Sequence, residues 1–399
     1  MKNSKAGVIL SFLATITLII VLSLFVTQTF GGHSEKVSVP KSVSASLNMT
    51  ITEIASTNNL KLDTVKDALK IKDTANLSKT LQELSISESD ANDLIIKKLN
   101  LEGEEASKNV ALIGAKFIIW AVLMTLAFVL LRRGKVTPML RKYLLLAAFL
   151  LTGVLLGPEP NQMSTVKDII SAFAIKGIIF LPRLIALSVF LLVVVLANKF
   201  ICAWGCQFGT LQDFIFRLNR KSNDKEAVFK QYKVPFSVSN SIRIVFFAVF
   251  ILIAFMWSID IIELVNPFGI YNPAVLSTIG IAFIAMLLIG SLFIYRPWCH
   301  FFCPFGLVGW VVEKFSFYKI KVNYDTCIAC GDCSKACPSD VMEAILKQDR
   351  VTPDCFSCGS CINACPTKSI EFNKGQRTTV PNEKFRDNTI ASVKNKVSH

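Results

Sequence analysis

The sequence predicts a mainly α-helical membrane protein with a small α+β module near its C-terminal end. Three observations predict this class. Of the 399 residues, 52% are hydrophobic and only 18% are charged, which is more apolar than an ordinary soluble domain. Six long apolar runs follow one another along the chain. Twelve cysteines stand in repeated patterns, so we expect apolar helices in a membrane and a cysteine-rich module outside it.

The six apolar runs are the predicted transmembrane helices. Most of them reach the roughly 20 residues that cross a hydrocarbon core about 30 Å thick. The third run is short and ends in Gly157-Pro158-Glu159-Pro160, so a re-entrant helix is the alternative interpretation there. The runs are residues 6–30, 111–131, 143–156, 177–200, 242–265 and 276–295.

Basic residues predict the orientation in the membrane. Lysine and arginine are frequent at 132–142 and 217–233 but absent between 265 and 276. Because basic loops stay inside, we expect a multi-pass protein of the inner (cytoplasmic) membrane with both chain ends in the cytoplasm. The apolar core of residues 1–30 is too long for a signal peptide, and Thr27-Gln28-Thr29-Phe30 lacks a small-x-small cleavage site, which favours an uncleaved N-terminal anchor. The net charge of +14 then reflects topology and an anionic membrane surface, and we expect no nucleic acid partner.

Two segments carry no predicted chemistry. Residues 31–110 are polar and lack cysteine, and they repeat apolar positions at i, i+3 and i+4 in two loose copies, 51–69 and 81–99. This pattern predicts a small extracytoplasmic helical insert with one shared core. Residues 374–399 are polar, charged and aperiodic, which predicts a flexible tail.

The densest cysteine pattern is C-x2-C-x2-C-x3-C-P, which occurs twice within residues 318–373. All four cysteines repeat at an offset of 28 residues. Three thiolates of one tight loop hold three corners of a cubane, and the fourth ligand comes from the other copy. Zinc sites lack the third cysteine and the trailing proline, and disulfides do not suit the reducing cytoplasm.

The pattern therefore predicts a bacterial two-cluster ferredoxin module with two [4Fe-4S] clusters. The expected ligands are Cys327, Cys330, Cys333 and Cys365 for cluster one, and Cys355, Cys358, Cys361 and Cys337 for cluster two.

The other four cysteines form two Cys-x3-Cys pairs 97 residues apart, Cys202 with Cys206 and Cys299 with Cys303. Each pair follows an apolar run, so the repeated unit is a pseudo-repeated hairpin that ends at the cytoplasmic boundary of the 111–317 membrane bundle. On a helix, positions i and i+4 put both thiols on one face. Two such hairpins could supply four soft ligands for a third cluster or another thiophilic metal. Buried structural cysteines and metal-free redox pairs remain alternatives.

Three polar residues are further candidates. Asp260 and Glu263 lie one helical turn apart near the outer end of the fifth run and could accept protons from a quinol, unless they are simply solvated. His300 lies inside the second cysteine pair, where it could bind a metal, move a proton or pack between aromatic rings. No C-x-x-C-H occurs, so covalent haem is not expected.

With these motifs the sequence resembles the NapH and NosR type of membrane polyferredoxin, the 4Fe-4S quinol dehydrogenase membrane components. The resemblance covers about residues 111–373. It implies that electrons pass between the quinol pool and a redox partner protein such as an extracytoplasmic reductase, with quinone as the substrate. There are two departures from the family. Gln207 stands where the family usually has proline, and residues 31–110 do not suit the flavin-binding domain of NosR, so covalent flavin is not expected.

We therefore expect a one-electron relay, as the electron-transfer subunit of a quinol dehydrogenase or oxidoreductase system. One alternative is an assembly or maturation factor that reduces a metal or a disulfide of a partner enzyme. Another is a redox-sensing membrane protein whose clusters do not turn over. The predicted clusters face the cytoplasm while the family's acceptors lie outside, so a further carrier has to cross the membrane. The Cys-x3-Cys pairs are the candidate for it.

Overall fold

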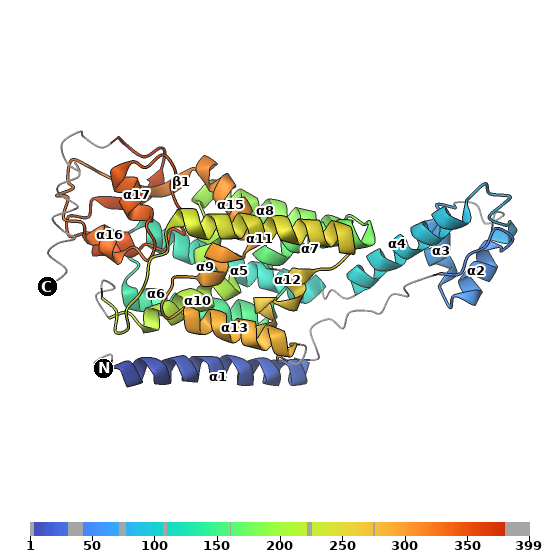
Figure 1. Ribbon diagram of the computed structural model, residues 1–399, viewed down its shortest axis with the longest axis horizontal. Coiled ribbons are helices and arrows are strands. Elements are labelled where there is room, and N and C mark those ends of the chain that lie inside the picture. Colours follow the sequence, from blue (N-terminus) through green and yellow to red (C-terminus); the bar gives the residue numbers. More distant parts are fainter. Residues whose placement is uncertain are drawn as a thin grey trace.

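A bundle of apolar helices lies between two smaller bodies (Figure 1). The computed structural model describes residues 4–30, 43–71, 77–106, 110–159, 161–221, 226–273 and 276–379. The helices of the insert lie beyond one end of the bundle, and the cysteine-rich module lies at the other. The first helix starts at the same end as that module.

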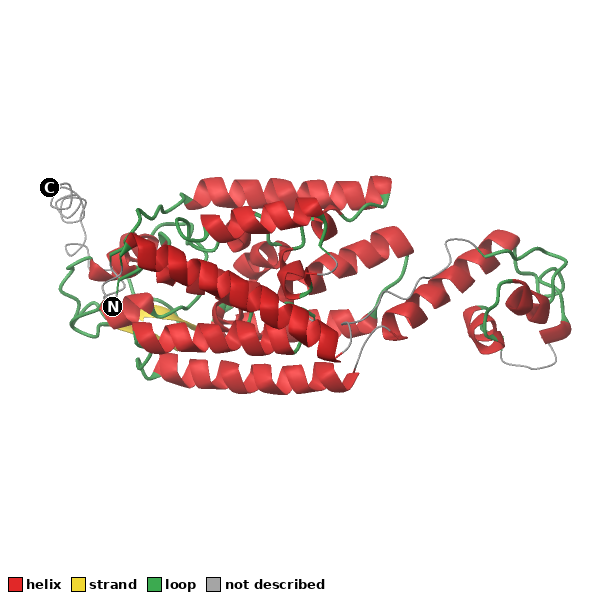
Figure 2. Ribbon diagram, turned by 90° about the horizontal axis from the view of Figure 1, so that it is seen from below, coloured by secondary structure: helices red, strands yellow, loops and turns green. Residues whose placement is uncertain are grey.

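Four helices are long and apolar enough to cross a membrane. They are α1 (Lys5–Phe30), α5 (Val110–Arg132), α6 (Pro138–Phe149) with its continuation η2 (Leu150–Leu155), and α11 (Phe236–Trp257). Two of the six predicted runs form shorter apolar helices, α8 (Leu181–Ala197) and α13 (Thr278–Gly290). Seen from below, α1 crosses in front of the other helices, and the strands are confined to the end with the cysteine-rich module (Figure 2).

The helix that contains the third apolar run is longer than the run itself indicates. Thr137 caps α6 by accepting a hydrogen bond from the N–H of Leu140, and Pro138 begins the helix. A π-helical segment then extends it to Leu155. Lys116 of α5 donates to the carbonyl oxygens of Gly157 (2.5 Å) and Glu159 (3.1 Å) at the following turn. The helical length therefore suits a span, which the apolar residues alone left open.

Two short helical hairpins turn back inside the bundle. The first pairs α9 (Phe200–Trp204) with α10 (Gln207–Leu218), and the second pairs α14 (Pro297–Phe301) with α15 (Pro304–Val312). Trp120, near the midpoint of α5, donates its Nε1–H to the carbonyl oxygen of Gly205 at 3.1 Å. The ring of Phe302 contacts that of Phe246, near the midpoint of α11, with centroids 5.2 Å apart. The tips of both hairpins therefore lie at mid-length of the long helices.

Three short elements close the bundle at the end opposite the module. Asn161 and Ser164 form a capping box at the start of α7 (Gln162–Lys176). Gly177 ends this helix in the left-handed conformation, with φ of 61°, which glycine adopts at little cost. α12 (Ile261–Leu264) and η3 (Pro267–Tyr271) follow α11.

The insert has its own core. Its helices are α2 (Ile51–Thr57), α3 (Leu62–Ala68) and α4 (Glu88–Ala106), and they share a cluster of buried apolar side chains, namely Val43, Ala45, Ile51, Ile54, Ala55, Val65, Ala68, Leu69, Leu81, Ala91 and Ile95. Thr50 and Thr80 pair in an antiparallel bridge. Each of these threonines exchanges hydrogen bonds with the glutamate three residues later. The expected second copy differs in that residues 81–85 form turns and no helix.

The cysteine-rich module is built on one antiparallel strand pair. β1 (Tyr318–Val322) follows η5 (Glu313–Phe315), and it pairs with β2 (Ile370–Lys374), with Val322 opposite Ile370. Between the strands lie α16 (Asp332–Ala336), α17 (Val341–Lys347) and α18 (Ser360–Ala364). The ring of Phe372 contacts the rings of Phe128 and Phe200, with centroids 5.6 and 6.2 Å apart, which seats the module on the bundle.

The expected tail begins later than residue 374. Lys374 belongs to β2. Arg377 and Thr378 donate side-chain hydrogen bonds to the carbonyl oxygens of Ile320 and Val322 in β1, both at 3.1 Å. Because β1 is an edge strand, its free backbone groups hold these residues. The rest of the predicted tail, 380–399, lies outside the described residues.

Candidate iron-sulfur sites

Eight cysteines of the module surround two cavities. One cavity is lined by Cys337, Cys355, Cys358 and Cys361. The other is lined by Cys327, Cys330, Cys333 and Cys365. Each set combines three cysteines of one motif with the last cysteine of the other. The fold therefore groups the thiols into the same two sets that the motif spacing predicts.

Two glycines shape the loops around these cavities. Gly331 and Gly359 stand before α16 and α18 with φ of 74° and 77°. A side chain at Gly359 would also place its Cβ 2.6 Å from Cδ1 of Leu131 in the bundle. Glycine meets both demands because it has no Cβ.

The chemistry of the donors fits an iron-sulfur cluster. Burial raises the pKa of the Cys333 and Cys355 thiols to about 12, so both are protonated near neutral pH, and the positive charge of bound iron would be what ionises them. Among the described residues, no three His, Cys, Asp or Glu side chains converge closely enough to hold a single metal ion. A cubane instead takes one thiolate at each of four separate corners. Four thiols around a cavity therefore fit a cluster better than one zinc ion.

The remaining four cysteines gather inside the bundle. We call Cys202, Cys206, Cys299 and Cys303 the membrane quartet. All four are buried. Cys299 interacts electrostatically with the three others, and Cys303 interacts with Cys202 and Cys206. The hairpins therefore bring two pairs together that are 97 residues apart in the chain.

The quartet differs from the sequence prediction in two respects. The pairs lie at mid-length of the long helices, whereas we expected them at the cytoplasmic ends. The two cysteines of a pair also do not share one helix. Cys202 lies in α9, while Cys206 caps the start of α10 and accepts a hydrogen bond from the N–H of Gly209 at 3.4 Å. Cys303 caps α15 in the same way with Gly306 at 3.4 Å. A helix N-terminus favours the thiolate form of a cysteine.

Each hairpin tip requires a glycine. A Cβ at Gly209 would lie 2.9 Å from the carbonyl oxygen of Cys202, and a Cβ at Gly306 would lie 2.8 Å from that of Cys299. The carbonyl belongs to the backbone and cannot swing aside. The motif is therefore better written Cys-x3-Cys-x2-Gly.

Three buried cations hold the hairpin tips. We call Lys199, Arg243 and Arg296 the cation collar. Arg296 donates to the carbonyl oxygens of Cys202 (2.5 Å) and Ala203 (3.1 Å). Arg243 donates to the carbonyl oxygen of Cys299 at 3.3 Å. Lys199 donates to that of Gly306 at 2.6 Å.

Two buried carboxylates pair with this collar. Asp354 accepts hydrogen bonds from Lys199 (2.5 Å) and Arg243 (2.8 Å). Asp213 accepts from Arg296 and from Arg217, both at 2.7 Å. Asp354 directly precedes Cys355, so its ion pairs join the cysteine-rich module to the bundle.

Sequence reasoning missed the collar, although a signal was present. Lys199 precedes Cys202 by three residues, as Arg296 precedes Cys299, so the 97-residue repeat includes a cation in both copies. Arg243 and the two aspartates carry no comparable signal. They come from α11, α10 and the module, and only the fold brings them to the quartet.

The loop of cluster two rests directly on the hairpins. Trp204 donates its Nε1–H to the carbonyl oxygen of Ser357 at 3.2 Å. The ring of Phe356 lies 5.4 Å from that of His300 and 5.1 Å from the guanidinium of Arg296. His300 thus packs between aromatic rings, and its Nδ1 lies 3.2 Å from the carbonyl oxygen of Arg296.

Gln207, the departure from the family's proline, bonds to the half of the bundle that lies away from the module. Its Nε2 donates to the carbonyl oxygen of Thr152 at 3.4 Å. The hydroxyl of Tyr271 donates to its backbone carbonyl at 3.0 Å. Tyr271 belongs to η3, so the first hairpin tip is linked to the end of the bundle opposite the module.

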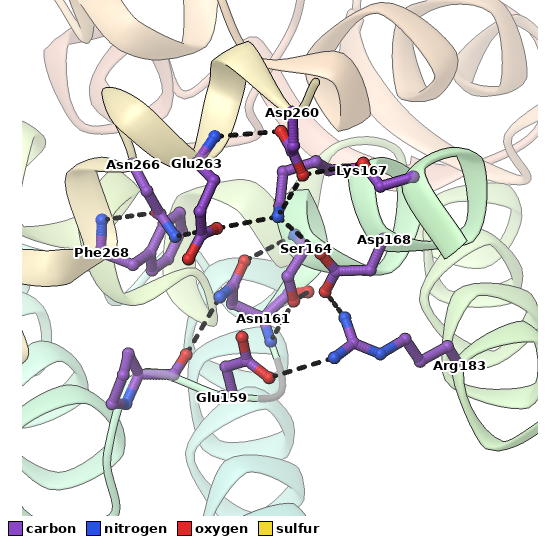
Figure 3. Close-up of polar contacts among 12 residues, drawn as sticks. Glu159, Asn161, Ser164, Lys167, Asp168, Arg183, Asp260, Glu263, Asn266 and Phe268 are labelled. Carbon is purple, nitrogen blue, oxygen red and sulfur yellow. Dashed lines mark hydrogen bonds and ion pairs between the residues drawn. The ribbon is translucent and has the colours of Figure 1, made fainter. Parts of the chain in front are cut away.

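Asp260 and Glu263 belong to an ion-pair cluster around Lys167 (Figure 3). Lys167 lies 2.9 Å from a carboxylate oxygen of each, and Asp260 also accepts from Ser171 at 2.7 Å. Lys167 bonds to Asp168 at 2.6 Å, and Arg183 pairs with Asp168. The side chain of Asp260 is 16% exposed and that of Glu263 is 42% exposed. Only Glu263 therefore matches the solvated alternative.

An apolar helical bundle joined to a module with eight cysteines around two cavities is the arrangement that we expect of a ferredoxin-type iron-sulfur protein. Comparison with known families agrees. A family model described as a 4Fe-4S dicluster domain matches residues 319–366. A second, described as a 4Fe-4S binding domain, matches residues 179–223 and 276–323. The second model therefore falls on both hairpins of the membrane quartet.

Several relatives have names that assign them to electron transport or to the ferredoxin type. The chain is 30% identical over 168 residues to YccM of Escherichia coli, whose name assigns it to electron transport; the match covers 40% of the chain and 46% of YccM. It is 27% identical over 148 residues to the ferredoxin-type protein NapH of Haemophilus influenzae, covering 36% of the chain and 49% of NapH.

The regulatory protein NosR of Pseudomonas aeruginosa is 25% identical over 145 residues, covering 34% of the chain and 19% of NosR. The chain thus spans about half the length of the first two relatives and a smaller part of NosR. No solved structure matches. The matches confirm the resemblance to the NapH and NosR type, and with the apolar helices they indicate a membrane protein with 4Fe-4S domains and homologues in electron transport.

Proposed function

We propose that the protein relays single electrons between the quinol pool and a redox partner protein, such as an extracytoplasmic reductase. One observation carries this proposal. The loop of cluster two contacts the two hairpins that carry the membrane quartet, through the Trp204–Ser357 hydrogen bond and the His300–Phe356 ring contact, and the quartet lies midway along the long helices. Thiol ligands are thus present from the module into the middle of the bundle, where a carrier toward the outer side is needed.

We assign the two cavities of the module to two [4Fe-4S] clusters, with the ligand sets given above, and the membrane quartet to a third. When bound, each cluster supplies a one-electron acceptor and donor. The chain's own residues provide the thiolates, exclude water and bring the loops together. The match of a 4Fe-4S family model to both hairpins supports the third assignment.

The topology that suits this function has six spans, with α8 and α13 completing the four longer helices as two pseudo-repeated hairpin units. Both ends of the chain and the module then lie in the cytoplasm, and residues 31–110 lie outside. The placement of the insert and the module at opposite ends of the bundle supports this topology (Figure 1).

We retain Asp260 and Glu263 as candidates for accepting the protons of a quinol. They lie at the end of the bundle opposite the module, next to the ion pairs of Lys167. A quinol that gives up its electrons also gives up protons, and a carboxylate within reach accepts them. Asp260→Asn is expected to slow quinol oxidation while leaving the iron content unchanged.

Anaerobic purification followed by reduction with a menaquinol analogue tests the proposal. We expect about twelve irons per chain, since each cubane holds four, and cluster EPR signals that grow on adding the quinol analogue. The matched variants are Cys206→Ser, which is expected to reduce the iron content to about eight, and Ser44→Ala, an exposed serine of the insert that is expected to change nothing.

Three results would contradict parts of this function. Clusters that the quinol analogue leaves oxidised would remove the quinol relay. Metal or disulfide reduction in a partner without quinol oxidation would favour an assembly factor. About eight irons in the unmodified chain would remove the third cluster and leave the module's pair.

A further inference from the structure

The region around the membrane quartet and cluster two holds more buried positive than negative charge. Among the described residues its buried cations outnumber its buried acids. The cations include the collar, Arg141, Arg217 and Lys116, which interacts electrostatically with Cys206. The acids are Asp213, Asp354 and Glu313. Even with every acid ionised, the cations remain in excess, and burying uncompensated charge is destabilising.

Buried hydrogen-bond donors in the same region also lack acceptors. Nε of Arg243, Nε of Arg296 and Nε1 of Trp298 have no hydrogen-bond partner within the described part of the chain. A buried donor without an acceptor is destabilising, because it has lost its hydrogen bond to water. Trp298 and Arg296 stand one and three residues before Cys299, so these donors belong to the second hairpin and its partner α11.

Both features call for an anion at the quartet. Four neutral thiols supply neither negative charge nor good acceptors. An oxidised [4Fe-4S] core with four thiolates is doubly negative, and its sulfurs accept hydrogen bonds. The two arginines are placed alike, since each donates to the carbonyl of the first cysteine of one pair and lies within 3.3 Å of where a Cβ of the tip glycine would stand.

We propose that the cation collar acts as a set of positioning residues that fixes the two hairpin tips around an anionic cluster and raises its reduction potential. This inference rests on the proposed third cluster and names the residues that tune it. Reduction adds one electron and therefore one negative charge. Nearby cations stabilise the reduced form more than the oxidised form, and a low dielectric strengthens this effect. A raised potential makes the site a better acceptor for electrons from a quinol.

An EPR-monitored redox titration of the anaerobically purified full chain tests the collar. The signal of the quartet is first identified as the one that Cys206→Ser and Cys303→Ser remove. We expect Arg243→Gln to lower the midpoint potential of that signal, and Arg243→Lys to restore most of it because the charge returns. Arg220→Gln is the matched control. It removes a buried arginine that bonds to Ala336 and Gln231, and it is expected to leave this potential unchanged.

Several outcomes decide between the possibilities. An unchanged midpoint potential in Arg243→Gln, with about twelve irons retained, would overturn the inference. Loss of the signal in both the glutamine and the lysine variants would also overturn it, since a charge effect requires the lysine to rescue. Loss in the glutamine variant alone would support the collar. About eight irons and no quartet signal in the unmodified chain would instead show that the proposed third cluster itself fails.

Discussion

Gly209 and Gly306 show how closely the backbone is packed at the hairpin tips. Each lies three residues after the second cysteine of its pair, where the chain starts a new helix. The neighbouring carbonyl of the first cysteine leaves no space for a Cβ. The segment from the second cysteine to this glycine thus turns the chain and directs the glycine N–H to the cysteine sulfur. The absence of a Cβ also allows an arginine to approach.

Gly306→Ala is expected to lower the free energy of unfolding by about 1–3 kcal/mol, because the added methyl group overpacks a rigid contact. It is also expected to reduce the iron content from about twelve to about eight per chain, since the quartet is displaced. Thermal unfolding and iron analysis measure both effects. Gly114→Ala is the control, because a Cβ there meets nothing within 4 Å. Full stability and iron content in Gly306→Ala would contradict the packing argument.

The grouping of the module's eight cysteines around two cavities was predictable at the residue level, whereas their surroundings were not. The motif spacing predicts the cysteine sets of both cavities because a cubane takes three thiols from one loop and one thiol from the other. The spacing of Cys202 and Cys206 also suggests a shared helix. This prediction is wrong, because the first helix ends before Gly205 and a new helix starts after Cys206. Helical periodicity does not report such a break when both flanking segments are apolar.

At the level of elements, the α9–α10 and α14–α15 hairpins explain why two of the apolar runs are longer than the helices that they contain. The runs 177–200 and 276–295 contain α8 and α13 but also the turns that follow them. The chain then re-enters the bundle. Backbone groups at these turns are satisfied by the collar and by Trp120, which is the condition for irregular backbone within a membrane protein.

The insert depends on its helix caps. Thr50 and Glu53 form a capping box at α2, and the hydrogen bonds that the backbone N–H and then the hydroxyl of Thr50 donate to the Glu53 carboxyl lower the pKa of that carboxyl. A lowered pKa means that this carboxylate stabilises the folded insert above its unfolded pKa, and that the contribution is lost as the pH falls through the folded value.

Faster amide exchange in α2 is therefore expected when the pH falls below about 4, after correction for the intrinsic exchange rate. Thr50→Ala is expected to speed exchange at pH 7 as well and to remove most of the pH effect. Hydrogen exchange of the full chain, followed by mass spectrometry, measures both. Unchanged protection of α2 in Thr50→Ala would show that the box contributes little. Ser56→Ala, at the far end of α2, is the control.

On the scale of the whole molecule, Asp354 connects the bundle to the module. It pairs with Lys199 from the first hairpin and Arg243 from α11 while standing next to Cys355. Asp354→Asn is expected to destabilise the protein by about 3–5 kcal/mol, because it leaves two buried cations without their counterion. Denaturation in detergent measures this loss. The exposed Asp349→Asn is the control, and similar stability of both variants would contradict the role of the pair.

The overall arrangement predicts which surfaces are accessible from each side. A single cysteine introduced for exposed Asn59 in the insert is expected to react with a membrane-impermeant thiol reagent in intact cells or spheroplasts. One introduced for exposed Lys374 at the end of β2 is expected to react only after the membrane is opened. The opposite pattern would reverse the proposed orientation and place the module outside.

The sequence alone determined the local chemistry: the apolar runs, the insert with its separate core, the two cluster sets and the 97-residue repeat of cysteines. These follow from short-range spacing and composition, which act before the chain folds. Only the tertiary structure decided where the repeat lies and what surrounds it. It placed the quartet at mid-length of the long helices. It also brought Asp213, Asp354 and Arg243 to the quartet from segments far apart in the chain. A buried charge is stable only where a residue from a distant part of the chain pairs with it, and no local sequence pattern predicts such a pair.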